Sequence, residues 1–261
     1  MDPRRPIPPP RYQPEISSSP AVARGGESSH GAVRKPPSPP PPAPGLILCR
    51  VWGGGIYEAD IFYDICDELG ILVWQDFPFA CGNYPVHSAF LLSIEEEVTA
   101  NLKRLRHHPC IVIYAGNNED YAYAESEGLE YEPNDPDPAH WLRTNFPARY
   151  IYEKLLPEIT RELVPGTYYH PGSPWGGKTS DDSTVGDIHQ WNVWHGEQKP
   201  YQEYGKLGGR FVSEFGMQSW PGVGTVDGCL LKGRRDEERF VGSRTLEWHN
   251  KATGGERRLA T

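Results

Sequence analysis

The strongest constraint in this chain is a repeated alternation of short apolar runs with amphipathic segments. Each apolar run has the length of one buried strand, and each amphipathic segment places its apolar residues on one helical face. This alternation predicts a parallel sheet with helical crossovers. Strands are predicted at 46–52, 71–74, 110–114, 167–170, 187–191 and 211–213, and helices at 58–69, 94–105 and 148–164.

Local signals set the expected helix boundaries. Gly70 follows the first helix at the position of a glycine C-cap. Ser93 and Glu96 have the spacing of a capping box, which predicts that the second helix begins there. Pro157 lies inside the third predicted helix and is expected to break or kink it, because proline has no backbone N–H to donate.

Polar and aromatic residues gather where the predicted strands end. In a (β/α)8 barrel the carboxyl ends of all strands converge on one face, which carries the chemistry. A doubly wound sheet would instead concentrate function at one switch point. Because residues of this kind follow strands throughout the chain, we expect an α/β fold with a (β/α)8 barrel. The residues are Arg50, Trp52, Asp76, Asn118, Glu119, His189, Trp191 and Glu214.

Two of these residues have the chemistry of a glycosidase. Glu119 and Glu214 each follow an apolar run and have small or aromatic neighbours. Retaining glycosidases use two carboxyl groups about 5–5.5 Å apart, one to protonate the leaving oxygen and one to attack the anomeric carbon. A single glutamate at a strand end is more often a solvated loop residue, but two in this setting favour catalysis.

The overall composition argues against several other classes of function. The formal net charge is −9, so a nucleic acid partner is not expected. No apolar run has the length of a membrane span, and no hydrophobic signal segment follows Met1, so we expect a cytoplasmic protein without membrane contact. The 5 cysteines form no CxxC pair, and no metal or organic cofactor is expected.

Four ordered motifs resemble the β-mannosidases of glycoside hydrolase family 2, the fungal enzymes in particular. The resemblance runs from about Cys49 to Pro221 and resumes at Ser243. The motifs are Arg-Val-Trp-Gly-Gly-Gly-Ile-Tyr-Glu at 50–58, Trp-Gln-Asp-Phe at 74–77, Ala-Gly-Asn-Asn-Glu at 115–119 and Ser-Glu-Phe-Gly-Met-Gln-Ser at 213–219.

The resemblance implies a retaining exo-β-mannosidase that releases terminal β-D-mannose from an oligosaccharide or glycan by double displacement. Glu119 would be the acid/base, and burial together with the charge of Glu214, the nucleophile, would raise the pKa of Glu119. The implied substrate contacts are Asn118 to the sugar 2-hydroxyl, Trp52 as an aromatic floor, Asp76 to ring hydroxyls, Arg50 beside Glu214, and His189 and Trp191 as pocket lining.

Three of these residues also have a purely structural interpretation. Trp52 could plug the barrel, Asp76 could cap the helix that follows it, and Arg50 could be a structural ion-pair partner. At the level of function, the alternatives are another family 2 β-glycosidase, acting on galactosides or glucuronides, and an inactive truncated fragment.

The domain organisation follows from composition and resemblance. Residues 1–45 are rich in proline and serine and are expected to form a disordered tail. Residues 46–221 are expected to form the partial catalytic barrel, corresponding to about strands two to seven of the family, and residues 222–261 an irregular segment. A barrel without its first and last strands has two open edges, so we expect the chain by itself to fold poorly or hydrolyse slowly.

Overall fold

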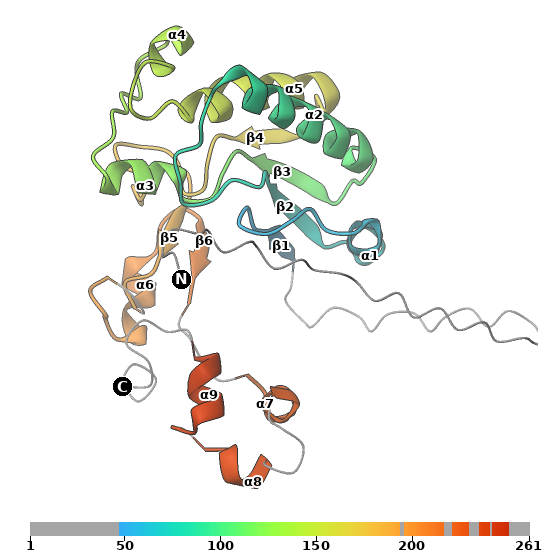
Figure 1. Cartoon of the computed structure of the whole chain (residues 1–261), viewed down its shortest axis with the longest axis vertical. Coiled ribbons are helices and arrows are strands. Elements are labelled where there is room, and N and C mark those ends of the chain that lie inside the picture. Colours follow the sequence, from blue (N-terminus) through green and yellow to red (C-terminus); the bar gives the residue numbers. More distant parts are fainter. Residues whose placement is uncertain (1–46, 194–195, 217–220, 230–234, 241, 251–261) are drawn as a thin grey trace, which may run out of the picture. The chain divides into compact units, whose positions relative to one another are not determined.

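The protein is represented by a computed structural model in which residues 47–193, 196–216, 221–229, 235–240 and 242–250 are described (Figure 1). The predicted disordered tail, residues 1–45, lies outside the described residues.

The described residues contain six strands, and every strand pair is parallel. They form a four-stranded sheet in the order β1-β2-β3-β4 and a two-stranded sheet of β5 and β6. The prediction of an α/β fold with parallel strands is therefore confirmed. The strands are β1 (Leu48–Val51), β2 (Leu72–Asp76), β3 (Ile111–Ala115), β4 (Tyr168–His170), β5 (Ile188–Gln190) and β6 (Val212–Phe215).

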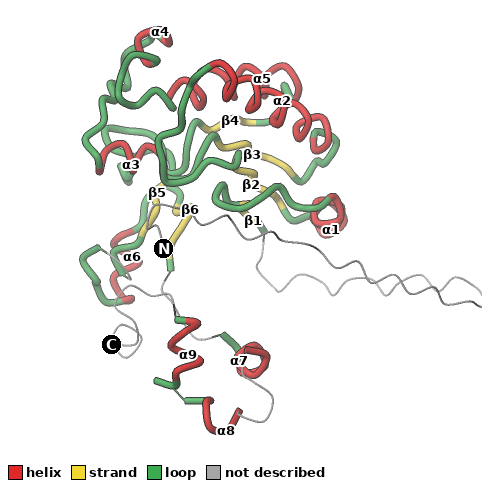
Figure 2. Tube along the Cα trace, viewed as in Figure 1, coloured by secondary structure: helices red, strands yellow, loops and turns green. Residues whose placement is uncertain are grey.

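Helices connect these strands, as the alternating pattern predicts, except that no helix is described between β4 and β5 (Figure 2). In the part of the chain that is described, no helix is both long and apolar enough to cross a membrane. The helices are α1 (Asp60–Leu69), α2 (Ser88–Leu105), α3 (Asp120–Ser126), α4 (Pro138–Trp141), η1 (Ile151–Leu155), α5 (Leu156–Leu163), η2 (Tyr201–Glu203), α6 (Tyr204–Leu207), α7 (Val223–Cys229), α8 (Arg235–Glu238) and α9 (Arg244–His249).

Two predicted helix boundaries are confirmed. Helix α1 ends at Gly70, which adopts the left-handed conformation of a C-cap with φ 68°. The irregularity predicted near Pro157 is also present, as a change from the π-helical turn η1 to α5 at Leu156, with helical backbone on both sides of the junction. This change places Pro157 in the first turn of a new helix, where its missing N–H has no intrahelical partner to lose.

Two other predictions are wrong. Helix α2 begins at Ser88 rather than at Ser93, because the Nδ1 atom of His87 accepts the first-turn N–H of Phe90 at 3.2 Å and caps the helix earlier. The segment after residue 221, expected to be irregular, contains the short helices α7, α8 and α9. Helices of this length carry too few residues for an apolar period to be visible in the sequence.

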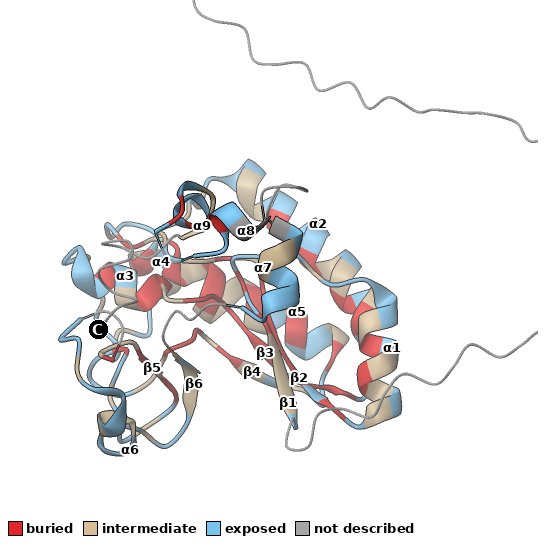
Figure 3. Cartoon of the chain, turned by 90° about the horizontal axis from the view of Figure 1, so that it is seen from below, coloured by how far each residue is buried: buried red, intermediate tan, exposed pale blue. Residues whose placement is uncertain are grey.

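One face of the four-stranded sheet is covered by helices. Val73 on β2 belongs to the same buried apolar cluster as Leu102 on α2 and Leu156 on α5. Figure 3 shows buried positions along β2 and β3 and on one side of α1 and α2. Burial of this apolar surface, worth about 25 cal/mol per Å², holds the helices on the sheet.

The other face of the sheet carries polar and aromatic side chains. Partner positions on neighbouring strands project to the same side of a sheet. Arg50 on β1 pairs with Trp74 on β2, and Ala115 on β3 pairs both with Asp76 on β2 and with His170 on β4. Arg50, Trp74, Asp76 and His170 therefore share the face opposite the helices.

The two sheets meet on this second face. The ring of Trp74 stacks on Phe211, beside β6, with centroids 5.8 Å apart. Between β4 and β5 an isolated bridge joins Trp175 to Asp187. The carboxyl ends of β1, β2 and β3 are thereby brought next to β5 and β6, and the site lies at this junction.

Candidate active site

The turn after β1 is built from glycines because two segments approach it closely. A Cβ atom on Gly53 would lie 2.6 Å from the carbonyl oxygen of Phe79. A Cβ atom on Gly54 would lie 2.0 Å from the ring of Trp52. Both distances are far shorter than van der Waals contact, so the glycines allow the Trp52 ring to rest against its own turn with 48% of the residue exposed.

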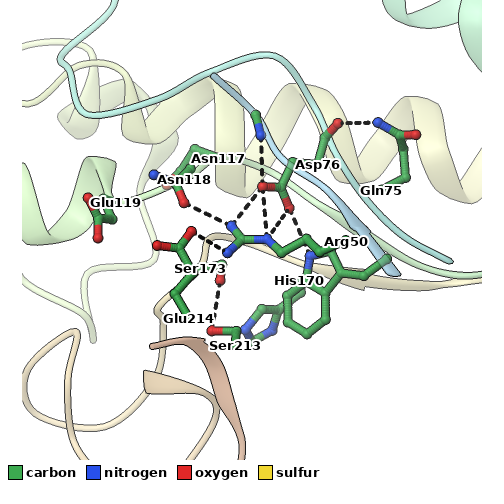
Figure 4. Close-up of polar contacts among 12 residues, drawn as sticks. Arg50, Gln75, Asp76, Asn117, Asn118, Glu119, His170, Ser173, Ser213 and Glu214 are labelled. Carbon is green, nitrogen blue, oxygen red and sulfur yellow. Dashed lines mark hydrogen bonds and ion pairs between the residues drawn. The ribbon is translucent and has the colours of Figure 1, made fainter. Parts of the chain in front are cut away.

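The guanidinium of Arg50 is the centre of the site (Figure 4). Its Nε and Nη2 atoms donate to Asp76, at 3.1 and 2.7 Å from Oδ2. Nη2 also donates to Asn118 Oδ1 at 2.9 Å, and Nη1 donates to Glu214 Oε1 at 2.7 Å. Nη1 lies 3.3 Å from His189 Nε2. The expected charge-assisted bond between Arg50 and Glu214 is confirmed.

Asp76 lies behind this guanidinium. Its side chain is 0% exposed, and it also accepts from the backbone N–H of Gly53 at 3.0 Å and from Trp74 Nε1 at 2.8 Å. Predicted as a ligand of ring hydroxyls, Asp76 is instead placed where it fixes Arg50. The alternative that it caps the following helix is also wrong, since His87 caps α2.

Glu119 occupies the turn between β3 and α3 with an unusual backbone. Its φ of 63° and ψ of 11° lie in the left-handed region, which costs a residue other than glycine about 1–2 kcal/mol. The N–H of Glu119 donates to the carbonyl oxygen of Ser173 at 2.8 Å, which holds the conformation. Backbone strain of this kind gathers at functional sites, where the surroundings fix it.

The two predicted catalytic carboxylates lie together around His189. The Nδ1 atom of His189 is 2.7 Å from Glu119 Oε1 and 3.4 Å from Glu214 Oε2. One oxygen of each carboxylate and a ring nitrogen of His189 all lie within 4.8 Å of one another. The pairing of Glu119 with Glu214, expected from their positions at strand ends, is present in the structure.

The environment of Glu119 differs from the expected one. The hydrogen bond from His189 is the largest influence, and it lowers the pKa of Glu119 below its usual value although burial acts in the opposite direction. The expectation of a raised pKa is therefore wrong. An N–H aimed at a carboxylate stabilises the charged form, and here this outweighs the desolvation of a partly buried group.

A hollow of about 720 Å³ opens over the carboxylates. All the residues predicted for the site line this hollow except Asp76 and His189, whose side chains are buried behind the lining residues. Trp52 and Trp191 supply aromatic surface, and Glu119 and Glu214 supply charge. The lining residues are Arg50, Trp52, Asn118, Glu119, Trp191, Ser213, Glu214 and Phe215.

Asp187 is a supporting residue that the sequence analysis missed. It accepts hydrogen bonds from Ser173 Oγ at 2.6 Å, from His170 Nε2 at 2.8 Å and from Ser213 Oγ. Burial alone would raise the pKa of Asp187, but these bonds together hold it below the usual value. Asp187 lies two positions before His189, and the period of two along a strand was the signal that could have identified it.

Cys81 is a second residue that no motif indicated. The residue is exposed, but its thiol turns toward the site: Sγ lies 3.4 Å from Glu119 Oε2 and accepts from Asn118 Nδ2 at 3.7 Å. Burial, followed by the charge of Glu119, raises the pKa of the Cys81 thiol to about 11. The neutral thiol can therefore donate to Glu119.

Glu119, His189 and Glu214 have donor atoms of the kind that divalent cations use. The Arg50 guanidinium already pairs with Glu214 and lies beside His189, so positive charge is supplied by the chain itself. The arrangement is that of two carboxylates held by an arginine and a histidine beside an aromatic hollow.

Curated relatives share most of this chain. A search against protein-family models found no match. β-Mannosidase B of Thermothelomyces thermophilus is 63% identical over 215 residues, which are 82% of this chain and 25% of that protein. β-Mannosidase B of Aspergillus fumigatus is 59% identical over 216 residues, again 82% of this chain and 25% of that protein.

A solved structure agrees with these relatives. The crystal structure of a β-D-mannosidase from Dictyoglomus thermophilum matches 82% of this chain with a TM-score of 0.70 and 41% sequence identity. The match covers 25% of that chain. This chain thus spans about a quarter of the length of the proteins that it resembles.

Proposed function

The chain belongs to the β-mannosidase family, of whose curated members it spans 25%, and on that premise we propose that it carries the catalytic centre of a retaining exo-β-mannosidase. The substrate would be a β-mannoside oligosaccharide or glycan, from which terminal β-D-mannose is released by double displacement. The observation that carries this proposal is the spacing of Glu119 and Glu214.

Carboxylate spacing distinguishes the two stereochemical outcomes of glycoside hydrolysis. Retaining enzymes hold their carboxyl groups about 5–5.5 Å apart, whereas inverting enzymes leave about 6.5–9.5 Å for a water molecule. Oxygen atoms of Glu119 and Glu214 lie within 4.8 Å of each other. This spacing supports direct attack by one carboxylate on the sugar.

In the first step Glu214 would be the nucleophile. One of its oxygens forms a bond to the anomeric carbon while the bond from that carbon to the leaving oxygen breaks. Glu119 donates its proton to the leaving oxygen, so the alcohol departs neutral. Arg50 donates to Glu214 Oε1, which holds this carboxylate in place and leaves Oε2 to attack.

In the second step Glu119 would be the base. It takes a proton from water while the water oxygen attacks the anomeric carbon and releases Glu214. The lowered pKa of Glu119, caused mainly by the hydrogen bond from His189, suits a residue that must be a carboxylate at this stage. The net reaction consumes one water and returns both carboxyl groups to their starting states.

The walls of the hollow fit a sugar ring. The exposed face of Trp52 can pack against the apolar C–H surface of a mannose unit. Asn118 accepts at Oδ1 from Arg50 and donates one N–H of Nδ2 to Cys81, which leaves a second N–H to donate to the sugar 2-oxygen. That contact would strengthen as the oxocarbenium-like state develops.

The same kinship bears on the fold. We propose that the two sheets are consecutive parts of one (β/α)8 barrel, with β1 to β6 corresponding to its second to seventh strands. Three features support this arrangement: all pairs are parallel, Trp74 stacks on Phe211 across the sheets, and Arg50 on β1 binds Glu214 on β6.

Turnover by the purified full chain tests the proposed function. We expect hydrolysis of p-nitrophenyl β-D-mannoside in preference to the β-galactoside and the β-glucuronide, with turnover lost in Glu119→Gln and Glu214→Gln. If the chain hydrolysed another glycoside faster, the assignment of mannose as the substrate sugar would be wrong, but the proposed mechanism would stand. No turnover of any β-glycoside by a chain that melts cooperatively in circular dichroism would refute the enzymatic proposal.

A further inference from the structure

The carboxylate of Asp187 is buried just before β5, with 3% of its side chain exposed. Its Oδ2 atom accepts from Ser173 Oγ at 2.6 Å and from Ser213 Oγ. Its Oδ1 atom accepts from His170 Nε2 at 2.8 Å and from the backbone N–H of Trp175 at 3.1 Å. A carboxylate has about four lone-pair sites, so these four donors fix its position and its orientation.

Ser173 connects Asp187 to Glu119. The backbone carbonyl oxygen of Ser173 accepts the N–H of Glu119 at 2.8 Å, and the N–H of Ser173 donates to the carbonyl oxygen of Asn117 at 2.9 Å. Ser173 is 0% exposed, so water does not compete for these bonds. The left-handed backbone of Glu119 is therefore held by a residue whose own side chain is bound to Asp187.

Ser213 connects the same carboxylate to Glu214. Ser213 directly precedes Glu214 on β6, and its Oγ atom donates to Asp187 Oδ2. Both serines thus bind one oxygen atom of Asp187, although they are 40 positions apart in the sequence. The segment that holds the predicted acid/base and the strand that carries the predicted nucleophile are joined at this atom.

The charge of Asp187 strengthens both connections. Burial acts to raise the pKa of Asp187, but the bonds from His170, Ser173 and Ser213 hold it below its usual value, so the group is a carboxylate at neutral pH. Hydrogen bonds from hydroxyl groups to a carboxylate are shorter and roughly twice as strong as those between neutral groups. A neutral acceptor at this position would hold the two serines less firmly.

We propose that Asp187 is a positioning residue that sets the separation of Glu119 and Glu214. It acts on the first through Ser173 and on the second through Ser213. The inference rests on the proposed function, because it concerns the alignment of the two carboxylates of that site. Retaining hydrolysis needs carboxyl groups about 5–5.5 Å apart, and a displacement of about 1 Å can lower a rate by about a hundredfold.

Asp187→Asn removes the charge and keeps the size of the side chain. Its amide oxygen can accept from His170 and Trp175, and its NH2 group can donate to the serine hydroxyl groups, which turn to accept. We expect cooperative melting, a KM close to wild type and a kcat lower by roughly tenfold to a hundredfold. A residue that only stabilised the fold would leave both constants of the folded chain unchanged, and that result would overturn the inference.

Variants of the two serines test the two connections separately, and they serve also if Asp187→Asn does not fold. A dinitrophenyl group departs without a proton, whereas the methanol of methyl β-D-mannoside needs one from Glu119. In Ser173→Ala we expect kcat/KM to fall by roughly tenfold or more for the methyl mannoside and little for the dinitrophenyl mannoside. In Ser213→Ala both substrates should be affected alike, because Glu214 attacks in both reactions. The same dependence on the leaving group in the two variants would overturn the inference.

Amide hydrogen exchange gives a readout that does not depend on turnover. The N–H of Glu119 should exchange faster by roughly tenfold in Asp187→Asn and in Ser173→Ala, because the carbonyl group that it binds is held less firmly. The matched control is Asp67→Asn, since Asp67 also accepts from a histidine and from a backbone N–H, that of Cys110. It should speed exchange at Cys110 and leave Glu119 unchanged. Unchanged exchange at Glu119 in Asp187→Asn would overturn the inference, whereas a chain without glycosidase activity would refute the proposed function alone.

Discussion

Arg50 Nη1 donates to Glu214 Oε1 at 2.7 Å across a sequence separation of 164 residues. The bond joins β1 to β6 and fixes the position of one carboxylate. Because the same guanidinium is held by the buried Asp76, the position of Glu214 is set by β1 and β2 as well as by its own strand.

Removal of this guanidinium should be costly. Arg50→Met leaves the buried Asp76 carboxyl, whose pKa is already raised by burial, without its partner, and loss of one member of a buried pair costs about 3–5 kcal/mol. We expect urea denaturation to show this decrease in the free energy of unfolding, and we expect hydrolysis to be lost as well. The matched control is Arg104→Met, whose partner Asp60 has a side chain 66% exposed, so it should cost less than about 1 kcal/mol. Equal stabilities for the two variants would contradict the structural role of Arg50.

Asp120 should make the stability of the fold depend on pH. Burial raises its pKa from 3.8 to about 7, although Tyr152 and Gly82 donate to it. Because the pKa is higher in the folded state than in the unfolded state, Asp120 stabilises the fold less as the pH rises from about 4 to about 7. Over that range the free energy of unfolding of Asp120→Asn should rise relative to that of wild type by on the order of 4 kcal/mol. At higher pH the difference should not increase further.

Thermal melts of both proteins from pH 4 to pH 8 measure this difference. The comparison isolates Asp120, because groups whose pKa is lowered, such as Asp187, contribute equally to both proteins. A difference between variant and wild type that does not change with pH would contradict the burial of Asp120 as the cause.

Cys81 should report on the charge of Glu119. Its thiol pKa is raised to about 11 by burial and by Glu119, so modification by methyl methanethiosulfonate should be slow at pH 8 and accelerate as the pH rises toward 11. The added group would lie beside Glu119 and block hydrolysis. Glu119→Gln should react faster at pH 8, because the neighbouring negative charge is removed.

Mass spectrometry of the modified chain gives these rates, and Cys81→Ser is the control that should keep its hydrolytic activity under the reagent. Modification of Cys81 that is already complete at pH 8, at the rate of an unperturbed thiol, would contradict the placement of the thiol against Glu119.

The turn after β1 should control sugar binding through Trp52. Gly54→Ala places a methyl group 2.0 Å from the present position of the Trp52 ring, so the ring must move. We expect KM for a β-mannoside to rise by roughly threefold to tenfold, the scale of one aromatic contact, with a smaller change in kcat. Gly55→Ala is the control, since its Cβ would approach no atom closer than 3.4 Å.

Much of the fold was readable because strand and helix periods differ. The succession of strands and helices and the parallel pairing of the strands follow from alternation along the chain. Helix α2 was misplaced because its cap is His87, a residue outside the usual set of N-caps, and because Ser93 continues a helix that has already begun.

The site was predictable in its members more than in its electrostatics. Glu119 and Glu214 lie in motifs that point to catalysis, and their meeting follows from the convergence of strand ends. The lowered pKa of Glu119 depends on the 2.7 Å bond from His189, and Ser173 reaches the site through its contacts with Asn118, Glu119 and His189. Contacts of this kind join loops distant in sequence, and no local pattern records them.

Trapping the glycosyl-enzyme tests the central claim most directly. In a 2-deoxy-2-fluoro-β-mannoside with a dinitrophenyl leaving group, fluorine slows both steps while the leaving group keeps the first one fast, so the covalent intermediate accumulates. We expect mass spectrometry of the digested chain to find the sugar on the peptide containing Glu214, with no such adduct in Glu214→Gln. An adduct on another residue, or β-mannoside turnover that first releases the α-anomer, would contradict the assignment of Glu214 as the nucleophile of a retaining mechanism.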